Sequence, residues 1–204
     1  MDFIEYVNKK MPGLFLLQVA TDSIVPGTIL KMPKRNLKPI GTAWEALGED
    51  GSLYPLRKSD ANMLEGTLRG SLAVKGNASL FGIISLSGDK SETYEVDYAL
   101  TGMSAREFKG IGEITLKKKL RKLKSTDKET WSIIDENLVV LICYYVSDFT
   151  ATFKMGGTTM SKGALEKIVE GGISGTRSTE YTSAGTITVT KNSKVPFGVK
   201  GFIL

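Results

Sequence analysis

A run of alternating residues between positions 64 and 75 constrains the fold of this chain more than any other feature. Small and apolar residues occupy every second position from Leu64 to Val74, and mostly polar or charged residues lie between them. Because successive side chains of a strand point to opposite faces, this spacing predicts a β-strand with one apolar and one polar face. Residues 93–101 repeat the pattern and form the expected partner, with the polar segment 87–92 expected to be a turn.

The C-terminal half predicts a second pair of strands. Residues 138–146, LVVLICYYV, form a continuous apolar run typical of a buried strand, and the chain then alternates through Phe149, Ala151 and Phe153. Residues 176–190 alternate weakly and are the expected partner of this strand. The material between the members of each pair could cover the hairpin tips or fold against the sheet.

Short helices are expected between these strands. Helical spacing marks residues 2–10, 104–124, 128–136 and 163–172, and two glycines, at 110 and 112, break the second of these into two pieces. The sequence therefore predicts a single domain over residues 1–204 of the α+β class. We expect a twisted antiparallel β-sheet with short flanking helices and two strand pairs able to extend into membrane β-hairpins.

Positive charge is concentrated in one stretch of the chain. The whole sequence carries a formal net charge of +5, and residues 106–124 alone hold eight Lys or Arg against two Glu. A solvated helix face would explain an ordinary charge run. Here nearly all of the imbalance lies in one segment, and a second cluster, Lys31 to Lys38, lies near a predicted amphipathic N-terminus. This pattern favours a phosphate-bearing partner, either an anionic membrane surface or nucleic acid.

The composition argues against most catalytic sites. The chain has no histidine and a single cysteine, Cys143, which lies within the apolar run. A Ser-His-Asp or Cys-His nucleophile, a His-ligated zinc or haem, and an intrachain disulfide are therefore excluded. We expect no enzymatic activity, no cofactor and no metal.

The alternating strands have two interpretations. An antiparallel sheet with one wet face and one core face is the more common explanation of such a pattern. A membrane β-hairpin is the more specific interpretation, because a spanning strand needs about 9–11 residues with alternate apolar and polar positions. Residues 64–74, 93–101 and 139–153 meet that length.

The order of these elements resembles the pore-forming domain of the gasdermin family. The G-x-L-x-G-x-L-x-V strand at 66–74 is similar to the start of the family's first membrane-inserting hairpin. NLVVLICYYV stands where family members have an N-x-Y-V-V-T-E strand, although the glutamate is missing here. Residues 185–204, GTITVTKNSKVPFGVKGFIL, resemble the family's closing strand, turn and alternating strand. Bacterial members often carry an N-terminal cysteine that can be acylated, where this chain has Asp2 and Phe3.

The resemblance implies a mechanism and a set of partners. Family members stay cytoplasmic while a C-terminal segment represses them, and a protease releases the pore-forming domain. That domain binds acidic lipid on the inner face of the plasma membrane and assembles into a large homo-oligomeric ring. Each copy contributes two hairpins to a β-barrel that kills the cell, as a host or antiviral defence. We expect residues 1–204 to be the pore-forming domain without its repressor segment, and we expect no nucleic-acid partner.

The candidate site residues form two groups. The expected lipid contacts are Lys9, Lys10, Lys34, Arg35, Lys117, Lys118, Lys119, Arg121 and Lys122. The expected membrane-inserting residues of the first hairpin are Leu64, Leu68, Leu72, Val74, Tyr94, Val96, Tyr98 and Leu100. Those of the second hairpin are Val140, Ile142, Phe149, Ala151 and Phe153. Two other classes of function stay open at this point: a soluble β-rich module that uses its basic helix on nucleic acid or an acidic protein, and a lipid-transfer or lipid-sensing domain that does not oligomerise.

Overall fold

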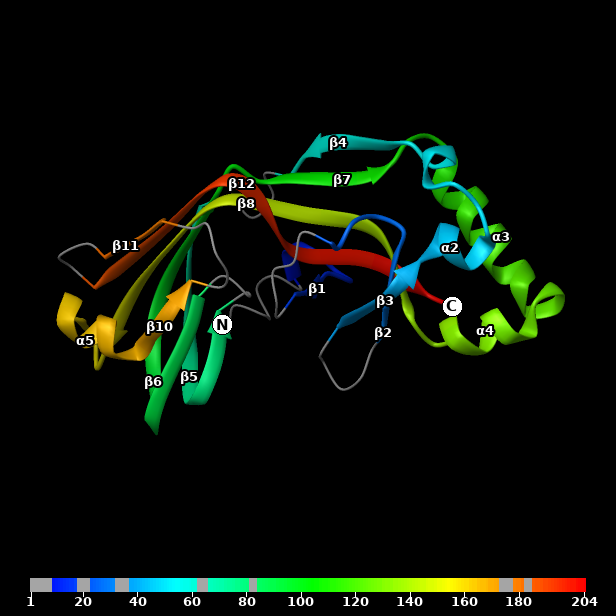
Figure 1. Ribbon diagram of the computed structural model, residues 1–204. Coiled ribbons are helices and arrows are strands. Elements are labelled where there is room, and N and C mark those ends of the chain that lie inside the picture. Colours follow the sequence, from blue (N-terminus) through cyan, green and yellow to red (C-terminus); the bar gives the residue numbers. More distant parts are fainter. Residues whose placement is uncertain are drawn as a thin grey trace.

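Long antiparallel strands run through the molecule and short helices gather at its two ends (Figure 1). The computed structural model describes residues 9–17, 23–31, 37–61, 66–80, 84–172, 178–181 and 185–204. In chain order the elements are β1 (Phe15–Leu16), β2 (Thr28–Lys31), β3 (Lys38–Thr42), α2 (Ala43–Leu47), the 3-10 helix η1 (Gly51–Leu53), β4 (Leu56–Asp60), β5 (Gly66–Leu80), β6 (Ile84–Thr101), β7 (Ser104–Phe108), α3 (Gly112–Thr126), α4 (Lys128–Ile134), β8 (Leu138–Met155), β9 (Thr158–Thr159), α5 (Lys162–Ile168), β10 (Val169–Gly172), β11 (Ser178–Tyr181) and β12 (Thr186–Ile203).

Strand β8 is the centre of a twelve-stranded sheet. Strand β12 follows one edge of β8 for almost its whole length, from Thr186 opposite Thr152 to Ile203 opposite Leu138. Along its other edge β8 pairs in turn with β6, β7 and β2. Every pairing between described strands is antiparallel. The strands also twist and bend along their length (Figure 1). The predicted fold class, an antiparallel sheet with short flanking helices, is confirmed.

Residues 138–146 of β8 lie in the part of the sheet that we call the helix-covered half. On one face, Val139 belongs to a cluster of buried side chains that includes Leu116 of α3. On the other face, Val140 packs with Leu17 from the N-terminal segment. Because the chain covers both faces, the strand is apolar at every position here, as the sequence predicted. Within the described residues, no helix is long and apolar enough to cross a bilayer.

Residues 148–154 of β8 lie in the other part of the sheet, which we call the two-faced half. Four strands run side by side here in the order β5, β6, β8 and β12, and β11 pairs with the outer edge of β12. The burial of β8 alternates in this segment, whereas it is nearly continuous in residues 138–146. The predicted pairing of 64–74 with 93–101 is confirmed for the described residues. Of the predicted partner 176–190 of β8, residues 186–190 pair with β8, whereas residues 178–181 form β11 and pair with β12 instead.

The two halves meet where three neighbouring strands change at the same level, which we call the break line. Strand β6 ends at Thr101, and Gly102 leads into β7 with a φ of 62°. Strand β8 is continuous here, but its buried positions change phase between Val146 and Phe149. In β12 the register shifts between Thr190 and Val195. Such a bulge bends a strand and increases its local twist.

The structure corrects three of the predicted elements. Residues 169–172, predicted to continue the helix that begins near 163, form β10, which pairs with β6. Residues 87–92, predicted to be a turn, belong to β6, which continues to Ile84 before the chain reverses. They pair with a β5 segment of similarly small and polar residues, so the ladder satisfies their backbone hydrogen bonds without a turn. Residues 104–108, predicted to be helical, form β7 between β4 and β8. Pairing with two strands overrides the local spacing of this segment.

Candidate functional site

The register of the two-faced half gathers alternate positions of four strands into common rows. Directly opposed residues in neighbouring strands lie on the same face of a sheet. Tyr98 of β6 is opposite Leu68 of β5 and Ala151 of β8, and Ala151 is opposite Ile187 of β12. The neighbouring rows are Gly66–Leu100–Phe149–Val189, Gly70–Val96–Phe153 and Leu72–Tyr94. The predicted apolar positions of the two strand pairs therefore share one face, which we call the apolar face.

Aromatic and aliphatic side chains pack closely on the apolar face. Tyr94 lies edge-on to Phe153, with ring centroids 6.3 Å apart and an interplanar angle of 77°. Tyr98 and Phe149 are also 6.3 Å apart. All four side chains are at most 1% exposed. The described apolar-face side chains of β6 and β8 are thus withdrawn from water in this conformation.

A segment outside the four strands contributes to the cover of the apolar face. Leu165 of α5 is 0% exposed and is buried in the same cluster as the residues of the apolar face. Met11 and Leu14, which precede β1, belong to the same cluster, but Leu14 packs against Gly198 of β12, which is opposite Tyr144 and so lies beyond the break line. Helix α5 lies within the connection between β8 and β12 (Figure 1). Material between the members of the second strand pair therefore folds against the sheet, one of the two arrangements that the sequence left open.

The opposite face of the same strands is polar. Here Thr150 is opposite Ala99 and Thr188, and the next row joins Asp97, Thr152 and Thr186. The Nζ of Lys154 donates to the Oδ2 of Asp97 at 2.7 Å. The hydroxyls of Thr152 and Thr186 lie 2.9 Å apart. The polar side chains thus bond to one another across the strands, so this face is hydrophilic as a unit.

The predicted membrane-inserting residues divide between the two halves. Seven of them lie buried on the apolar face: Tyr94, Val96, Tyr98, Leu100, Phe149, Ala151 and Phe153. The backbone register places Leu68, Leu72 and Val74 in line with them, and Leu64 is outside the described residues. Val140 and Ile142 lie across the break line, where Val140 is in the core beneath the N-terminal segment and Ile142 is opposite Glu107 of β7.

Helix α3 carries most of the predicted lipid contacts. Its buried stripe is formed by Leu116 and Leu120, both 0% exposed, as the sequence predicted. Side chains three and four residues apart lie on one face of a helix. The lysines of α3 do not share the spacing of Leu116 and Leu120, so they lie on other faces of the helix. Lys117 is held on the flank by an ion pair with Glu113 at 2.7 Å, and its Nζ lies 5.0 Å from the ring centroid of Phe202.

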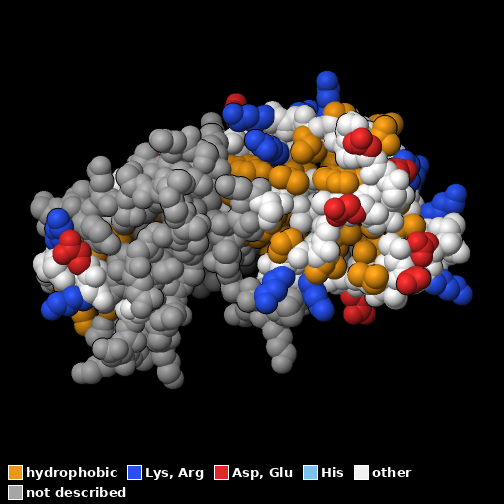
Figure 2. All heavy atoms as spheres, in the orientation of Figure 1, with side chains coloured by type: hydrophobic (Ala, Val, Ile, Leu, Met, Phe, Trp, Pro, Cys, Tyr) orange, Lys and Arg blue, Asp and Glu red, His pale blue; other side chains and the backbone are white. Residues whose placement is uncertain are grey.

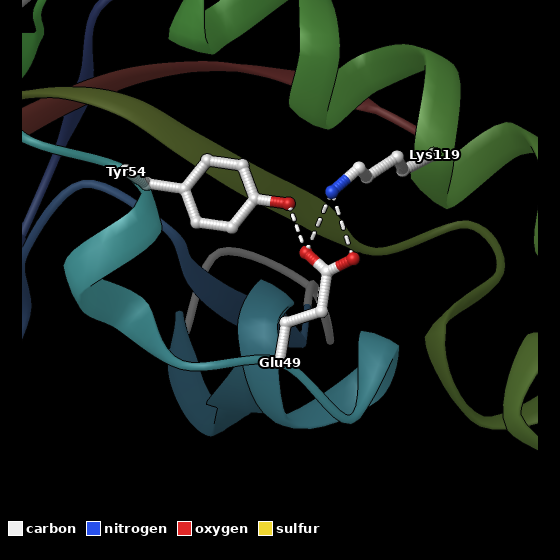
Figure 3. Close-up of polar contacts among 3 residues, drawn as sticks. All are labelled: Glu49, Tyr54 and Lys119. Atoms are coloured by element: carbon white, nitrogen blue, oxygen red, sulfur yellow. Dashed lines mark hydrogen bonds and ion pairs between the residues drawn. The ribbon is translucent and has the colours of Figure 1, made fainter.

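Lys119 is turned toward the body of the protein. Its Nζ lies 2.7 Å and 2.9 Å from the two carboxylate oxygens of Glu49, and the hydroxyl of Tyr54 donates to the same carboxylate (Figure 3). The Lys119 and Tyr54 hydrogen bonds lower the pKa of Glu49, and the Glu49 contact raises the pKa of Lys119. The contact ties α3 to the segment between α2 and η1. Lys119 is therefore occupied by a structural contact.

Three cations of α3 face outward. Lys118, Arg121 and Lys122 are exposed, and no hydrogen bond or ion pair with another described residue engages their side chains. They are four, seven and eight residues after Ile114, so they share one side of the helix. That side lies opposite the buried leucines. Of the five cations predicted on α3, these three form the accessible group.

The remaining predicted lipid contacts lie elsewhere. Lys9 and Lys10 are exposed and helical, and the adjacent Met11 is buried in a different cluster from the leucines of α3. The structure does not join them with the α3 cations in one patch. Lys34 and Arg35 lie outside the described residues.

Sequence reasoning missed a cationic pair on the ribbon of β4 and β7. Lys58 of β4 is directly opposite Arg106 of β7, and the Arg106 guanidinium lies 5.3 Å from the ring centroid of Tyr145. Arg57 forms an ion pair with Glu107 at 3.0 Å on the neighbouring row. Charged residues alternate with others in 56–60, but the sequence alone does not show which strand they meet.

No catalytic or metal-binding arrangement is evident among the described residues. Cys143 is 0% exposed and its Sγ donates to the carbonyl oxygen of Ile24 at 3.4 Å, as expected of a core thiol. The described part of the chain holds no group of three His, Cys, Asp or Glu side chains that could bind a metal.

Comparison with known proteins was made by sequence and by structure. No protein-family description and no curated protein matches the sequence. Among solved structures, the chain is similar to a bacterial gasdermin from Bradyrhizobium tropiciagri, with a TM-score of 0.49 and 11% sequence identity over 96% of this chain and 83% of that chain. The likeness concerns the arrangement of the chain, and the function proposed below rests on this chain's own rows and charges.

Proposed function

We propose that this chain is a membrane pore former of the gasdermin type. In this proposal it binds acidic lipid through its outward cations, assembles with further copies into a large ring and inserts two β-hairpins per copy. The hairpins are β5–β6 and β8–β12. The resulting pore is expected to span the plasma membrane and to kill the cell. A protease and a repressor segment belong to the same proposal as the expected means of control.

The single observation that supports this proposal most is the contiguous two-faced sheet. In lipid every backbone polar group needs an internal partner, so inserted strands must pair side by side. The order β5, β6, β8 and β12 already places two antiparallel hairpins next to each other. One face of all four strands is apolar and the other is polar, which is the pattern that separates lipid from a water-filled lumen.

The first hairpin already has the required length, and the second does not. Nine consecutive positions from Gly66 to Val74 pair with β6, against the roughly 9–11 residues that a spanning strand needs. In the two-faced half, only residues 148–152 of β8 pair with residues 186–190 of β12. Refolding of residues 156–185 would lengthen this hairpin and remove Leu165 from the apolar face in the same step.

The accessible cations of α3 supply the proposed attraction to lipid. A cation close to an anionic leaflet contributes about 1 kcal/mol. Lys118, Arg121 and Lys122 are positioned to do this without breaking any contact, whereas Lys117 and Lys119 would first leave Glu113 and Glu49. Lys9 and Lys10 are a second exposed pair that could meet the same surface.

Dye release from vesicles tests the proposal directly. We expect leakage from vesicles that contain phosphatidylserine and none from pure phosphatidylcholine vesicles, together with ring-shaped particles in electron micrographs. The same exposed cations would also suit nucleic acid or an acidic protein, which is the second candidate function. Tight binding of nucleic acid with intact anionic vesicles would favour that candidate and contradict the pore.

Neighbouring positions on opposite faces provide a matched pair of variants. Leu68→Asp combined with Leu72→Asp places charge on the side proposed to meet lipid, so it should abolish leakage but leave vesicle binding intact. Ser71→Asp changes the adjacent exposed position on the polar side and should leak like the original chain. Equal leakage from both variants would contradict the assignment of faces.

Cysteine accessibility keeps the proposal testable if the double variant fails to fold. In a Cys143→Ala background, Thr150→Cys and Ala151→Cys probe adjacent positions on the polar and apolar faces of β8. After insertion, a water-soluble thiol reagent should modify position 150 and spare position 151. Equal modification of both positions in leaking vesicles would rule out insertion of this strand in the proposed orientation.

A further inference from the structure

The outward side of α3 carries isoleucines as well as cations. Ile111 is 74% exposed and Ile114 is 55% exposed, although most large hydrophobic side chains of the described chain are buried. Ile114 precedes Lys118, Arg121 and Lys122 on the same side of the helix, and Ile111 continues that line by one further turn. Two exposed aliphatic side chains therefore precede three cations along the same side of the helix.

The position of Ile111 conflicts with local preference. It is the N-cap residue of α3 and makes no side-chain hydrogen bond to the helix. Ser, Thr, Asp or Asn is strongly favoured at an N-cap because its side chain accepts a hydrogen bond from the first turn, and isoleucine cannot. Gly110, with a φ of 62°, precedes it and Gly112 follows it, so a tight turn displays the side chain. Such conflicts between local rules and structure are expected at functional sites.

The surroundings of the isoleucines extend the apolar surface without adding acids to the stripe. Leu56, 37% exposed, pairs with Phe108, and the Lys109 amide donates to the carbonyl of Pro55 at 2.8 Å. This places the start of β4 beside the turn that holds Ile111. Glu113, the nearest acid of the helix, is bound to Lys117 on the flank. Figure 2 shows hydrophobic side chains over the end of the molecule that carries α2 and α3, with both basic and acidic side chains among them.

We propose that Ile111 and Ile114 insert into the interfacial region of an anionic bilayer while Lys118, Arg121 and Lys122 contact its headgroups. Helices that lie in a membrane interface combine an apolar edge with flanking Lys and Arg in this way, because the cations hold the acyl boundary within reach of short apolar side chains. The phosphates of nucleic acid would attract the cations, but nucleic acid offers no apolar region in which the isoleucine side chains could be buried. This inference rests on the membrane partner proposed above and adds an apolar anchor that acts before the hairpins move.

Sedimentation with vesicles separates the two contributions. The full chain is mixed with vesicles of 30% phosphatidylserine in phosphatidylcholine at low and high salt. Ile111→Ser with Ile114→Ser should weaken binding about 30-fold at either salt concentration, because apolar burial is little affected by screening. Lys118→Gln with Arg121→Gln and Lys122→Gln should lose the salt dependence instead. Unchanged binding of the isoleucine variant would overturn the inference.

Two exposed isoleucines outside α3 provide the matched control. Ile40 is 40% exposed and Ile203 is 52% exposed. Ile40→Ser with Ile203→Ser should bind like the original chain, and equal losses in both double variants would show a general surface effect and overturn the assignment to α3. Light scattering in solution tests whether the isoleucines instead bind a second copy of the chain. If Ile111→Ser with Ile114→Ser converts a dimer to a monomer, they do so and the inference is wrong.

An environment-sensitive dye reports insertion at one position. Ile111→Cys offers an exposed thiol, whereas Cys143 is 0% exposed and escapes brief labelling of the folded chain. A blue shift of the dye on anionic vesicles supports insertion, and emission that stays aqueous overturns it. Leakage is read in the same samples. Binding with a blue shift but no leakage would contradict the pore and retain the anchor, and leakage without a blue shift would do the reverse.

Discussion

One strand, β8, passes through two different environments. In residues 138–146 both of its faces are buried beneath helices and the N-terminal segment, and nearly every side chain belongs to a core. In residues 148–154 one face is buried and the other carries Thr152 and Lys154 toward neighbouring polar strands. The helix-covered half is thus packed against other parts of the chain on both faces of the sheet. The two-faced half is covered only on its apolar face, and α5, which contributes to that cover, is not part of its four strands. A sheet built this way can lose the cover of one half and keep the other.

The break line marks where these two environments separate. A side chain at Gly102 would place its Cβ 1.9 Å from the Oγ of Ser147, so the two strands approach closely at this level. The Oγ of Ser147 lies 3.3 Å from the carbonyl oxygen of Thr101 and 2.8 Å from Asp148 Oδ2, so its single proton serves both acceptors. The change at this level is therefore held by specific contacts between β6 and β8. It gives the two-faced half a boundary at which its pairing can change independently.

The largest expected difference between the halves comes from adding charge to β8. Val140→Asp buries an unpaired carboxylate at a 0% exposed position and should cost about 5 kcal/mol, enough to prevent folding of a marginally stable chain. Thr150→Asp adds the same group to the polar face and should change stability by less than about 1 kcal/mol. Urea unfolding followed by circular dichroism measures both. Similar losses would show that the two parts of β8 are not differently exposed.

A smaller effect is expected at the break line. Gly102→Ala introduces both a disfavoured positive φ and a clash with Ser147, and should cost about 4 kcal/mol. Gly156 has a φ of 57°, but no atom lies within 4 Å of the place that a Cβ would take, so Gly156→Ala should cost only about 1 kcal/mol. Adding Ser147→Gly should recover part of the Gly102→Ala loss and leave the Gly156→Ala loss unchanged. Equal costs at the two glycines in thermal unfolding would remove the evidence for a close approach at the break line.

Truncation of a leucine in each half should cost similar free energy but expose different regions. Leu120→Ala beneath α3 and Leu165→Ala in α5 both empty a 0% exposed site and should each cost about 3 kcal/mol. Hydrogen exchange distinguishes them. Leu165→Ala should raise exchange first in residues 148–154 and 94–100, and Leu120→Ala should raise it first around 138–141. A uniform increase in both variants would mean that the halves unfold as one unit.

The sequence predicted what depends on local periodicity. The stripe of Leu116 and Leu120 and the strand at 66–74 follow from spacing alone, and the structure confirms the stripe and the pairing of that strand. The change at Ser147 left a trace in the sequence, because alternation in β8 changes phase between Val146 and Phe149. That trace does not say which strands meet there, since pairing is set by contacts between distant residues.

Long-range partners were the part that sequence could not supply. Lys119 looked like any other lysine in a basic run, and its partner Glu49 is 70 residues away. The turn predicted at 87–92 failed for the same reason, because its composition fits a loop as well as it fits a strand opposite other small residues. For the candidate site, the basic run predicted the right residue types on α3 but could not divide them into the bound lysines and the outward ones.

The smallest effect concerns the Glu49–Lys119 contact, which lies wholly in the helix-covered half (Figure 3). The pKa of Glu49 is lowered from 4.5, so its contribution to stability is complete above that pH and is lost as the pH falls through the lowered pKa. The pKa of Lys119 is raised from 10.5, so its contribution is complete below that pH and is lost as the pH rises through the raised pKa. Glu49→Gln should therefore lower the melting temperature slightly between about pH 5 and 10.

The difference from the original chain should vanish in acid, where the carboxylate of Glu49 is protonated in both states. Because the contact does not touch the two-faced half, hydrogen exchange in residues 148–154 should be unchanged by Glu49→Gln at neutral pH. Lys154→Gln is the matched variant in the other half, since it removes the 2.7 Å bond to Asp97 and should loosen those residues alone. If Glu49→Gln loosened residues 148–154 as well, the break line would not separate the halves energetically, and both would have to move together during any insertion into a membrane.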